Sequence, residues 1–252
     1  MAASDVTTGP KSEPKIGRYR MLEVEQAPES PGLYAWYVSF NSSAQDWKTR
    51  PEGGIDAATE GYLNLLRQYA GYFEPLPITL RGSASYGGAW SGLLELDHGL
   101  SGTSEPSQSN DEAHASAQEK DREALSETIS SQDGRRVLSL LLEQATPMFS
   151  SPLYIGVAEN IRQRLEQHRK KYSQGIEWIS SHPSRVDELH SRASNFGLRA
   201  AARGIAMEHL EAWVIDLGDV ADDGVPAKKL RETSRSAEWL LHRLFTPILG
   251  RQ

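Results

Sequence analysis

The sequence predicts an α+β fold, because strand patterns and helix patterns are both present along the chain. Residues 31–40 (PGLYAWYVSF) are aromatic and β-branched after a Pro-Gly turn, which is typical of a buried strand. Residues 160–171 place Ile161, Leu165 and His168 on one stripe at helical spacing, with Asn160 as the expected N-cap. No stretch approaches the run of about 20 apolar residues that spans a bilayer.

The first half of the chain contains four further predicted segments. Residues 1–15 are polar and lack the apolar core of a signal peptide, so we expect a disordered tail and a cytoplasmic protein. Residues 41–57 are expected to form a loop. A helix is predicted at residues 60–73, where apolar side chains recur at helical spacing. Two strands follow, at residues 78–82 and 89–96.

Residues 101–134 are predicted to form an acidic, flexible linker. The segment holds eight acidic and two basic residues and almost no large apolar side chain. An alternative interpretation is an acidic tract that mimics DNA and restrains the functional site. Residues 135–146 are apolar enough for a short buried helix.

Beyond residue 150 the predicted elements follow one another closely. A short strand at residues 153–157 leads into the helix at 160–171. The remaining elements are a short helix at 194–206, a strand at 209–217, a turn-rich loop at 219–228 and a final helix at 236–245 that Pro247 ends.

The charge distribution separates the middle of the chain from its C-terminal part. The chain of 252 residues has a formal net charge of -7. Residues 31–150 hold 8 basic and 16 acidic residues, whereas residues 151–252 hold 15 basic and 13 acidic ones. A local DNA-binding face is therefore compatible with the sequence, but a polybasic binder is excluded. Cysteine is absent, which excludes disulfides, Cys-ligated zinc and a Cys nucleophile.

One motif carries the functional prediction. Tyr154-Ile155-Gly156 is followed by Arg164 and, four residues later, by His168, which places the last two on one helical face. Together these residues resemble the second half of the GIY-YIG nuclease motif. Gly32-Leu33-Tyr34 resembles the first half, and Glu238 resembles the metal-binding Glu of the last helix in that family.

The resemblance implies both a fold and a domain organisation. The fold is a small, mainly antiparallel sheet flanked by helices, with a large insertion between its first two strands. The nuclease domain would comprise residues 16–40 and 150–252. The insertion at 41–149 would hold a small α/β subdomain at about 58–100 before the linker and the short helix. A hairpin tolerates such an insertion because closure entropy rises only slowly with loop length.

The resemblance also implies catalytic roles. Glu238 would bind one Mg²⁺ or Mn²⁺ ion, and the guanidinium of Arg164 suits two phosphate oxygens. One of Tyr34 and Tyr154 would activate the attacking water while the other positions water or phosphate; we favour Tyr34. His168 completes the predicted catalytic set.

Nucleic-acid contacts and one departure from the family pattern are also expected. Three basic residues on the same helix as Arg164 are candidates for nucleic-acid binding, and a fourth candidate lies further along the chain: Arg162, Arg169, Lys170 and Arg199. Many family members carry an Asn shortly after the final Pro, where this chain has Gly250.

The favoured function is a metal-dependent DNA endonuclease, with restriction or anti-phage defence as the first hypothesis for its role. DNA repair and homing cleavage are alternatives within the same enzyme class. A non-cleaving nucleic-acid-binding or regulatory subunit is an alternative from another class. The insertion would serve target recognition, restraint of the site, or docking of a protein partner or a second copy.

Overall fold

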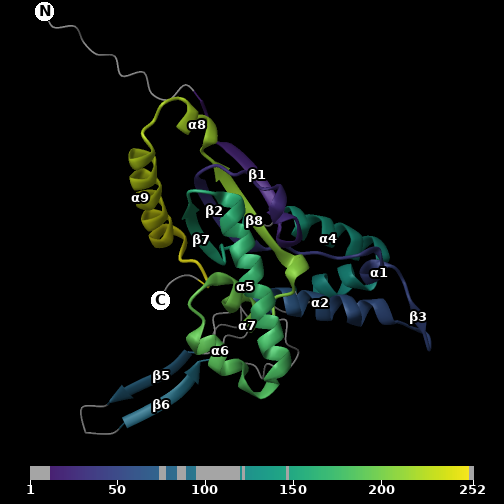
Figure 1. Ribbon diagram of the computed structural model, residues 1–252. Coiled ribbons are helices and arrows are strands. Elements are labelled where there is room, and N and C mark those ends of the chain that lie inside the picture. The colour runs from purple at the N-terminus through teal and green to yellow at the C-terminus, as the bar shows by residue number, and fades with distance from the viewer. Residues whose placement is uncertain are drawn as a thin grey trace, which may run out of the picture. The chain divides into compact units, whose positions relative to one another are not determined.

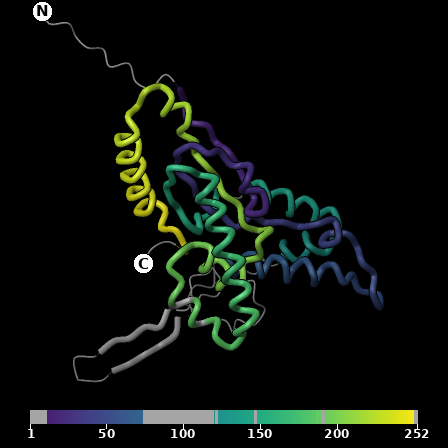
Figure 2. Tube along the Cα trace, in the orientation of Figure 1, coloured from purple at the N-terminus to yellow at the C-terminus, as the bar shows by residue number. Residues whose placement is uncertain are grey.

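The structure, a computed structural model, consists of two compact units. It describes residues 12–73, 78–83, 89–94, 120, 123–145 and 148–249. Unit 1 comprises the chain up to residue 39 and from residue 145 onward, and unit 2 comprises residues 40–144. Both contain helices and strands, so the α+β class is confirmed (Figures 1 and 2). In the described ranges no helix is long and apolar enough to cross a membrane.

A four-stranded antiparallel sheet forms the centre of unit 1. Its strand order is β1-β8-β2-β7. The strands comprise Lys15–Arg20 (β1), Gly32–Val38 (β2), Tyr154–Ala158 (β7) and Leu210–Asp216 (β8). β2 pairs with β7 along one edge and with β8 along the other, although unit 2 lies between β2 and β7 in the sequence.

The predicted disordered tail is wrong at its C-terminal end, because strand β1 begins at Lys15. The sequence predicts a disordered tail that includes Lys15 and no strand at Arg20, yet both residues pair with β8. The strand KIGRYR is polar and largely exposed, so it has no apolar pattern of its own. Its pairing depends on backbone hydrogen bonds to β8 and on the ion pair between Arg18 and Glu211. Residues 1–11 lie outside the described ranges.

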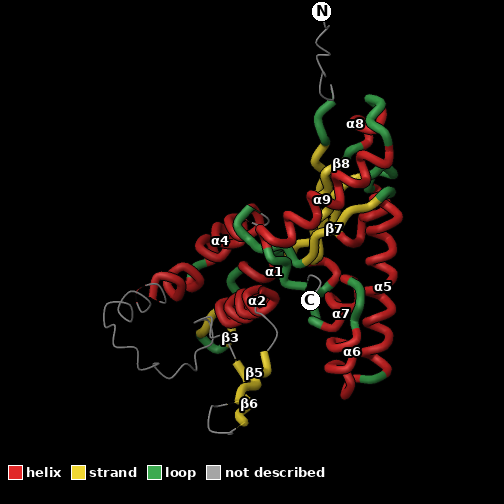
Figure 3. The backbone as a smooth tube through the Cα atoms, turned by 90° about the vertical axis from the view of Figure 1, so that its left-hand side faces the viewer, coloured by secondary structure: helices red, strands yellow, loops and turns green. Residues whose placement is uncertain are grey.

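Two helices cover the face of the sheet that carries Tyr34. Helix α5 (Ile161–Ser181) crosses this face, and α7 (Phe196–Ala202) packs on α5 (Figures 1 and 3). The side chain of Asn160 caps α5 by accepting a hydrogen bond from Gln163 N at 2.9 Å, as predicted. A Cβ at Gly197 would lie 2.2 Å from the carbonyl oxygen of His168, so only glycine permits this approach.

Helix α5 extends ten residues beyond its predicted end at residue 171. The buried side of the helix continues with Tyr172 and Gly175, which face α7 and the segment after it. The Tyr172 hydroxyl donates a hydrogen bond to the carbonyl of Ile205 at 2.8 Å. This tertiary packing stabilises the helix beyond residue 171, where the local apolar pattern is weak.

The final helix is longer than predicted. Helix α9 comprises Ala227–Phe245, and α8 (Gly218–Asp222) precedes it, so most of the expected loop at 219–228 is helical. The first half of α9 is rich in charge, which hides its buried positions Leu230 and Ser234 from a search for apolar periodicity. After α9 the backbone runs beside the residues that precede β7, since Ile248 N and Leu249 N donate to the carbonyls of Pro152 and Leu153. Gly250 lies outside the described ranges.

Unit 1 is completed by short elements. These are the 3-10 helices η1 (Met21–Gln26), η2 (Pro183–Arg185) and η3 (Met207–His209), and the helix α6 (Val186–Arg192).

Unit 2 has more regular structure than the sequence predicted. The expected loop at 41–57 contains α1 (Ala44–Trp47) and a two-stranded pair, β3 (Pro51–Glu52) with β4 (Ile55–Asp56). Helix α2 (Ala57–Phe73) agrees with the predicted helix but begins three residues earlier. The two predicted strands are present as an antiparallel pair, β5 (Ile78–Ser83) and β6 (Ala89–Leu94).

The predicted flexible linker is wrong at its C-terminal end. Residues 123–130 are helical, and α4 comprises Gln132–Ala145 rather than residues 135–146. Ile129 belongs to a buried cluster with Phe40, Tyr62 and Leu66. The acidic composition concealed this single buried position. The other residues of the predicted linker, apart from residue 120, lie outside the described ranges.

Arg135 explains why this segment is ordered. The side chain is fully buried in unit 2, and its guanidinium makes four hydrogen bonds. It donates to the carbonyls of Trp47 at 3.0 Å and Ile129 at 2.7 Å, to Thr59 Oγ1 at 3.2 Å, and to Asp56 Oδ2 at 2.7 Å. One cation therefore joins segments from both ends of unit 2. A buried charge is tolerated only when it is paired and hydrogen-bonded in this way.

Arg135→Met should destabilise unit 2 by about 2–4 kcal/mol, because the carbonyls of Trp47 and Ile129 lose their hydrogen-bond donor inside the unit. Hydrogen exchange of α2 and α4 measures the effect. The matched control is Arg136→Met, whose side chain is 47% exposed and pairs with Asp133 at 3.6 Å. Arg135→Lys should also be destabilised, since an ammonium cannot make the planar set of contacts. Equal protection in Arg135→Met and Arg136→Met would contradict this account.

Candidate active site

Two tyrosines from neighbouring strands lie side by side beneath α5. In the β2–β7 register, Tyr34 is opposite Gly156 and Trp36 is opposite Tyr154. Positions two apart on a strand share one face. Tyr34 and Tyr154 are therefore diagonal neighbours on one face, with ring centroids 6.1 Å apart and an interplanar angle of 30°. Both side chains are buried.

Gly156 provides the space that the two tyrosines occupy. A Cβ at this position would lie 2.6 Å from the Tyr34 hydroxyl oxygen and 2.9 Å from Cε1 of Tyr154. Real Cβ atoms do not approach other atoms so closely, so a side chain here would displace one ring. The glycine of the Tyr-Ile-Gly segment thus has a direct steric role.

Helix α5 brings Arg164 and His168 to the Tyr34 hydroxyl. Arg164 Nε donates a hydrogen bond to this oxygen at 3.2 Å, and His168 Nε2 lies 2.8 Å from it. Arg164 and His168 are one helical turn apart, so the i,i+4 spacing seen in the sequence places both above one strand residue. Tyr34 as a residue is only 2% exposed, and its hydroxyl has a hydrogen-bond partner on each side.

The pKa shifts at the site indicate that both His168 and Tyr34 are uncharged. Burial, and then the nearby charge of Arg164, lower the pKa of His168 to about 3, so this imidazole is neutral at ordinary pH. Burial also raises the pKa of Tyr34, with further contributions from Tyr154 and Glu238, while Arg164 acts in the opposite direction. Because Arg164 can only donate, the favoured arrangement has Tyr34 accept from Arg164 and donate its own proton to Nε2 of His168.

Aromatic rings keep water away from His168. Trp36 and Phe196 stack with centroids 5.1 Å apart, and His168 meets Phe196 edge-on at 5.5 Å. Neither aromatic side chain was among the predicted site residues. Side chains two apart on a strand share a face, so the sequence of β2 could have placed Trp36 on the same face as Tyr34. Phe196 could not be found in this way, because it reaches the site only when α7 packs on α5.

Glu238 lies on α9, the fourth element that carries a predicted catalytic residue, after β2, β7 and α5. It is partly exposed, and its charge contributes to the raised pKa of Tyr34. Helix α9 is held beside β7 by a hydrogen bond of 3.0 Å from His242 Nε2 to the carbonyl of Ile155, and by an edge-on contact of His242 with Tyr154. Glu238 is thus positioned from the side opposite to α5.

The described residues contain no group of three His, Cys, Asp or Glu side chains that could hold a metal ion. A Mg²⁺ ion in a phosphate-processing site often uses only one or two carboxylates, with water and substrate phosphate as the other ligands. The single carboxylate of Glu238 is compatible with this mode of binding.

The other predicted basic residues have different surroundings. Arg162 bonds Glu29 at 2.6 Å, and Arg169 bonds Glu25 at 2.6 Å, whereas Lys170 is exposed. Arg199 donates to the carbonyls of Ala193 and Leu249, both at 2.9 Å, and so attaches the segment after α9 to α7. These contacts give the Arg199 guanidinium a structural use that differs from the predicted nucleic-acid contact.

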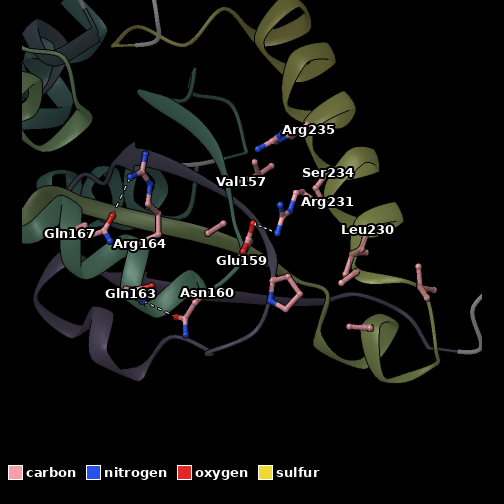
Figure 4. A pocket seen from close by; sticks show the side chains of 15 residues that line it. Val157, Glu159, Asn160, Gln163, Arg164, Gln167, Leu230, Arg231, Ser234 and Arg235 are labelled. Atoms are coloured by element: carbon pink, nitrogen blue, oxygen red, sulfur yellow. Dashed lines mark hydrogen bonds and ion pairs between the residues drawn. The ribbon is translucent and has the colours of Figure 1, made fainter.

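A cavity of about 810 Å³ opens beside Arg164 (Figure 4). It lies between the end of β7, the first turns of α5 and the first half of α9. Its charged lining consists of Glu159, Arg164, Arg231 and Arg235. The last two were not predicted, because the final helix was expected to begin only at residue 236. With the true start, Arg231, Arg235 and Glu238 fall on one helical stripe.

Comparison of the chain with protein-family models, with curated proteins and with solved structures gave no match.

Gly156→Ala should destabilise unit 1 by about 1–3 kcal/mol, because the new methyl group must displace Tyr34 or Tyr154. Denaturant unfolding followed by tyrosine and tryptophan fluorescence measures the change. Gly71→Ala on α2 is the control, since no atom lies within 4 Å of its new Cβ, and it should be neutral or stabilising by up to about 1 kcal/mol. Equal stability of the two variants would show that the tyrosines do not need this space.

The buried neutral His168 should make unit 1 less stable in acid. The pKa of His168 is about 3 in the folded state, against 6.5 for an ordinary histidine. Below pH 6.5 the unfolded chain binds a proton that the folded chain does not, so stability is lost as the pH falls from 6.5 towards 3. The free energy of unfolding should drop by about 2 kcal/mol by about pH 5 through this residue.

Denaturant unfolding at several pH values tests this expectation. His168→Gln should show a flatter dependence on pH, whereas His182→Gln, which retains His168, should keep the slope of the wild type. Parallel curves for wild type and His168→Gln would contradict the assignment of this acid sensitivity to His168.

Proposed function

We propose that the chain is a metal-dependent DNA endonuclease whose catalytic unit is of the GIY-YIG type. The observation that carries the proposal is the position of the Tyr34 hydroxyl. It lies between Arg164 Nε at 3.2 Å and His168 Nε2 at 2.8 Å, beside the second tyrosine of the motif. Any buried hydroxyl needs a hydrogen-bond partner, but here one partner is a cationic donor and the other a neutral imidazole that can accept a proton, which is the pairing that proton transfer requires.

Arg164 is the proposed phosphate ligand. It uses Nε for Tyr34 and one terminal nitrogen for Gln167 Oε1 at 3.2 Å, and it lines the cavity beside the tyrosines. Its remaining N–H groups can bind phosphate oxygens in the fork geometry that arginine favours. The same side chain would therefore hold the scissile phosphate and orient the hydroxyl that acts on the attacking water.

Tyr34 is the proposed proton acceptor for that water, and His168 would take the proton that Tyr34 releases. This relay avoids a free tyrosinate, which burial disfavours at Tyr34. A phosphate anion on Arg164 would offset the charge that helps to lower the pKa of His168, and so would make His168 a stronger base. Tyr154 would then position the water or the phosphate.

Glu238 is the proposed ligand for Mg²⁺ or Mn²⁺. When bound, the ion would act as a Lewis acid on the phosphate and stabilise the departing oxygen. Loss of the free carboxylate charge on binding would also remove one of the contributions that raise the pKa of Tyr34.

Unit 2 is the proposed insertion between the two tyrosine strands. A catalytic site of this size has few side chains for reading bases, so we assign target recognition or partner docking to unit 2. Restriction or anti-phage defence remains the hypothesis for the biological role.

The burial of Tyr34 favours one second candidate, a non-cleaving nucleic-acid-binding or regulatory subunit. Because Tyr34 is only 2% exposed, its hydroxyl would meet a water molecule only after Arg164 or a neighbour shifts. A chain in which this shift never occurs would bind DNA without cutting it.

Cleavage of plasmid DNA with Mg²⁺ or Mn²⁺ tests the proposal. Tyr34→Phe and Glu238→Gln should each lower kcat by about 10²-fold or more, because one removes the proton acceptor and the other the metal ligand. Tyr37→Phe, on the opposite face of β2, and Glu232→Gln, an exposed position of α9, should cleave like wild type. If wild type binds DNA and never cuts it with either metal, the non-cleaving candidate is correct. If Glu232→Gln and Glu238→Gln lose activity equally, the role of Glu238 is wrong.

A further inference from the structure

The cavity beside Arg164 has a positive lining although the chain as a whole is acidic. Three arginines and one glutamate make up its charged residues: Arg164, Arg231, Arg235 and Glu159. Arg164 comes from α5 and the other two arginines come from α9, so opposite walls supply them (Figure 4). An excess of positive charge in a concave site is the expected surrounding for an anion.

The two arginines of α9 are aligned with Glu238. Arg231, Arg235 and Glu238 are spaced i, i+4 and i+7, which places them on one stripe of the helix that is about 10 Å long. Figure 4 shows the side chains of Arg231 and Arg235 extending from α9 towards the end of β7. The stripe therefore runs from the proposed metal ligand into the cavity.

Arg235 has a free guanidinium within the described part of the chain, where no hydrogen bond or ion pair engages it. Arg231 forms an ion pair, in which Glu159 Oε1 lies 2.6 Å from Arg231 Nη2. This pair is open to solvent, with side-chain exposures of 52% and 70%. An exposed pair of this kind contributes little to stability, so a phosphate can displace the carboxylate.

We propose that Arg231 and Arg235 bind the phosphodiester backbone of DNA on the nucleotides next to the phosphate held by Arg164. Guanidinium groups bind phosphate oxygens through two parallel N–H donors. Glu159 competes with the DNA for Arg231, and thereby weakens binding until the backbone displaces it. The inference rests on the proposed function for the identity of the ligand as DNA, but it concerns binding and not the chemical step.

Fluorescence anisotropy with a fluorescein-labelled 20-base-pair DNA duplex tests the proposal. The titrations are made in EDTA, so that no metal-dependent cleavage occurs, and at several NaCl concentrations. Arg231→Gln and Arg235→Gln should each weaken binding about tenfold, and should reduce the slope of log affinity against log salt by about one. Lys229→Gln is the matched control, because it removes one charge from an exposed position of α9 that does not line the cavity.

Glu159→Gln should change affinity in the opposite direction. Removal of the competing carboxylate should tighten binding about two- to fivefold, the scale set by an exposed ion pair. Thermal unfolding confirms that each variant is folded. Binding by Glu159→Gln that is no tighter than wild type overturns the competition assigned to Glu159.

The two proposals fail in different assays. If Arg231→Gln and Arg235→Gln bind DNA as tightly as Lys229→Gln, or if wild type does not bind the duplex, the backbone-binding role is overturned. If these variants weaken binding while wild type never cleaves, the backbone-binding role stands and the nuclease proposal falls.

Discussion

Burial of the Tyr34 hydroxyl is the constraint on which the candidate site depends. A hydroxyl removed from water without a partner is destabilising by a few kcal/mol, so the fold has to supply partners where the strand places the oxygen. Helix α5 supplies both, from two residues one turn apart. The same burial keeps His168 neutral and Tyr34 protonated. Packing and proton chemistry at this site therefore have one cause.

The arrangement requires a glycine backbone to approach its neighbours closely at two places, side chains in one case and the backbone of a helix in the other. Gly156 leaves room for two aromatic rings on adjacent strands, and Gly197 lets α7 contact the backbone of α5 at His168. Through α7, Phe196 reaches the imidazole and excludes water from it. Both glycines thus act on the chemistry of the site indirectly, by permitting the packing that removes solvent.

The two units use buried charge in different ways. In unit 2, Arg135 satisfies its hydrogen bonds within the unit and joins distant segments. In unit 1, Arg164 uses only part of its guanidinium within the protein and also lines a cavity. The arginines of α9 line the facing wall of that cavity. A fully paired guanidinium indicates a structural role, whereas donors aimed into a concave site favour anion binding. Arg199 also uses two of its donor groups on backbone carbonyls, and so joins α7 to the segment after α9.

The sequence by itself determined the α+β class, strands β2, β7 and β8, the N-cap at Asn160, and the one-turn spacing of Arg164 and His168. These features arise from neighbouring residues, whose periodicity and capping chemistry are local. Only the tertiary structure decided that residues 15–20 form the edge strand β1, that α9 begins at Ala227, and that the segment around Arg135 is helical. In each case polar or charged residues are held by partners far along the chain. The periodicity of neighbouring residues does not reveal such distant partners. The burial that sets the pKa of His168 is likewise a property of the packed unit.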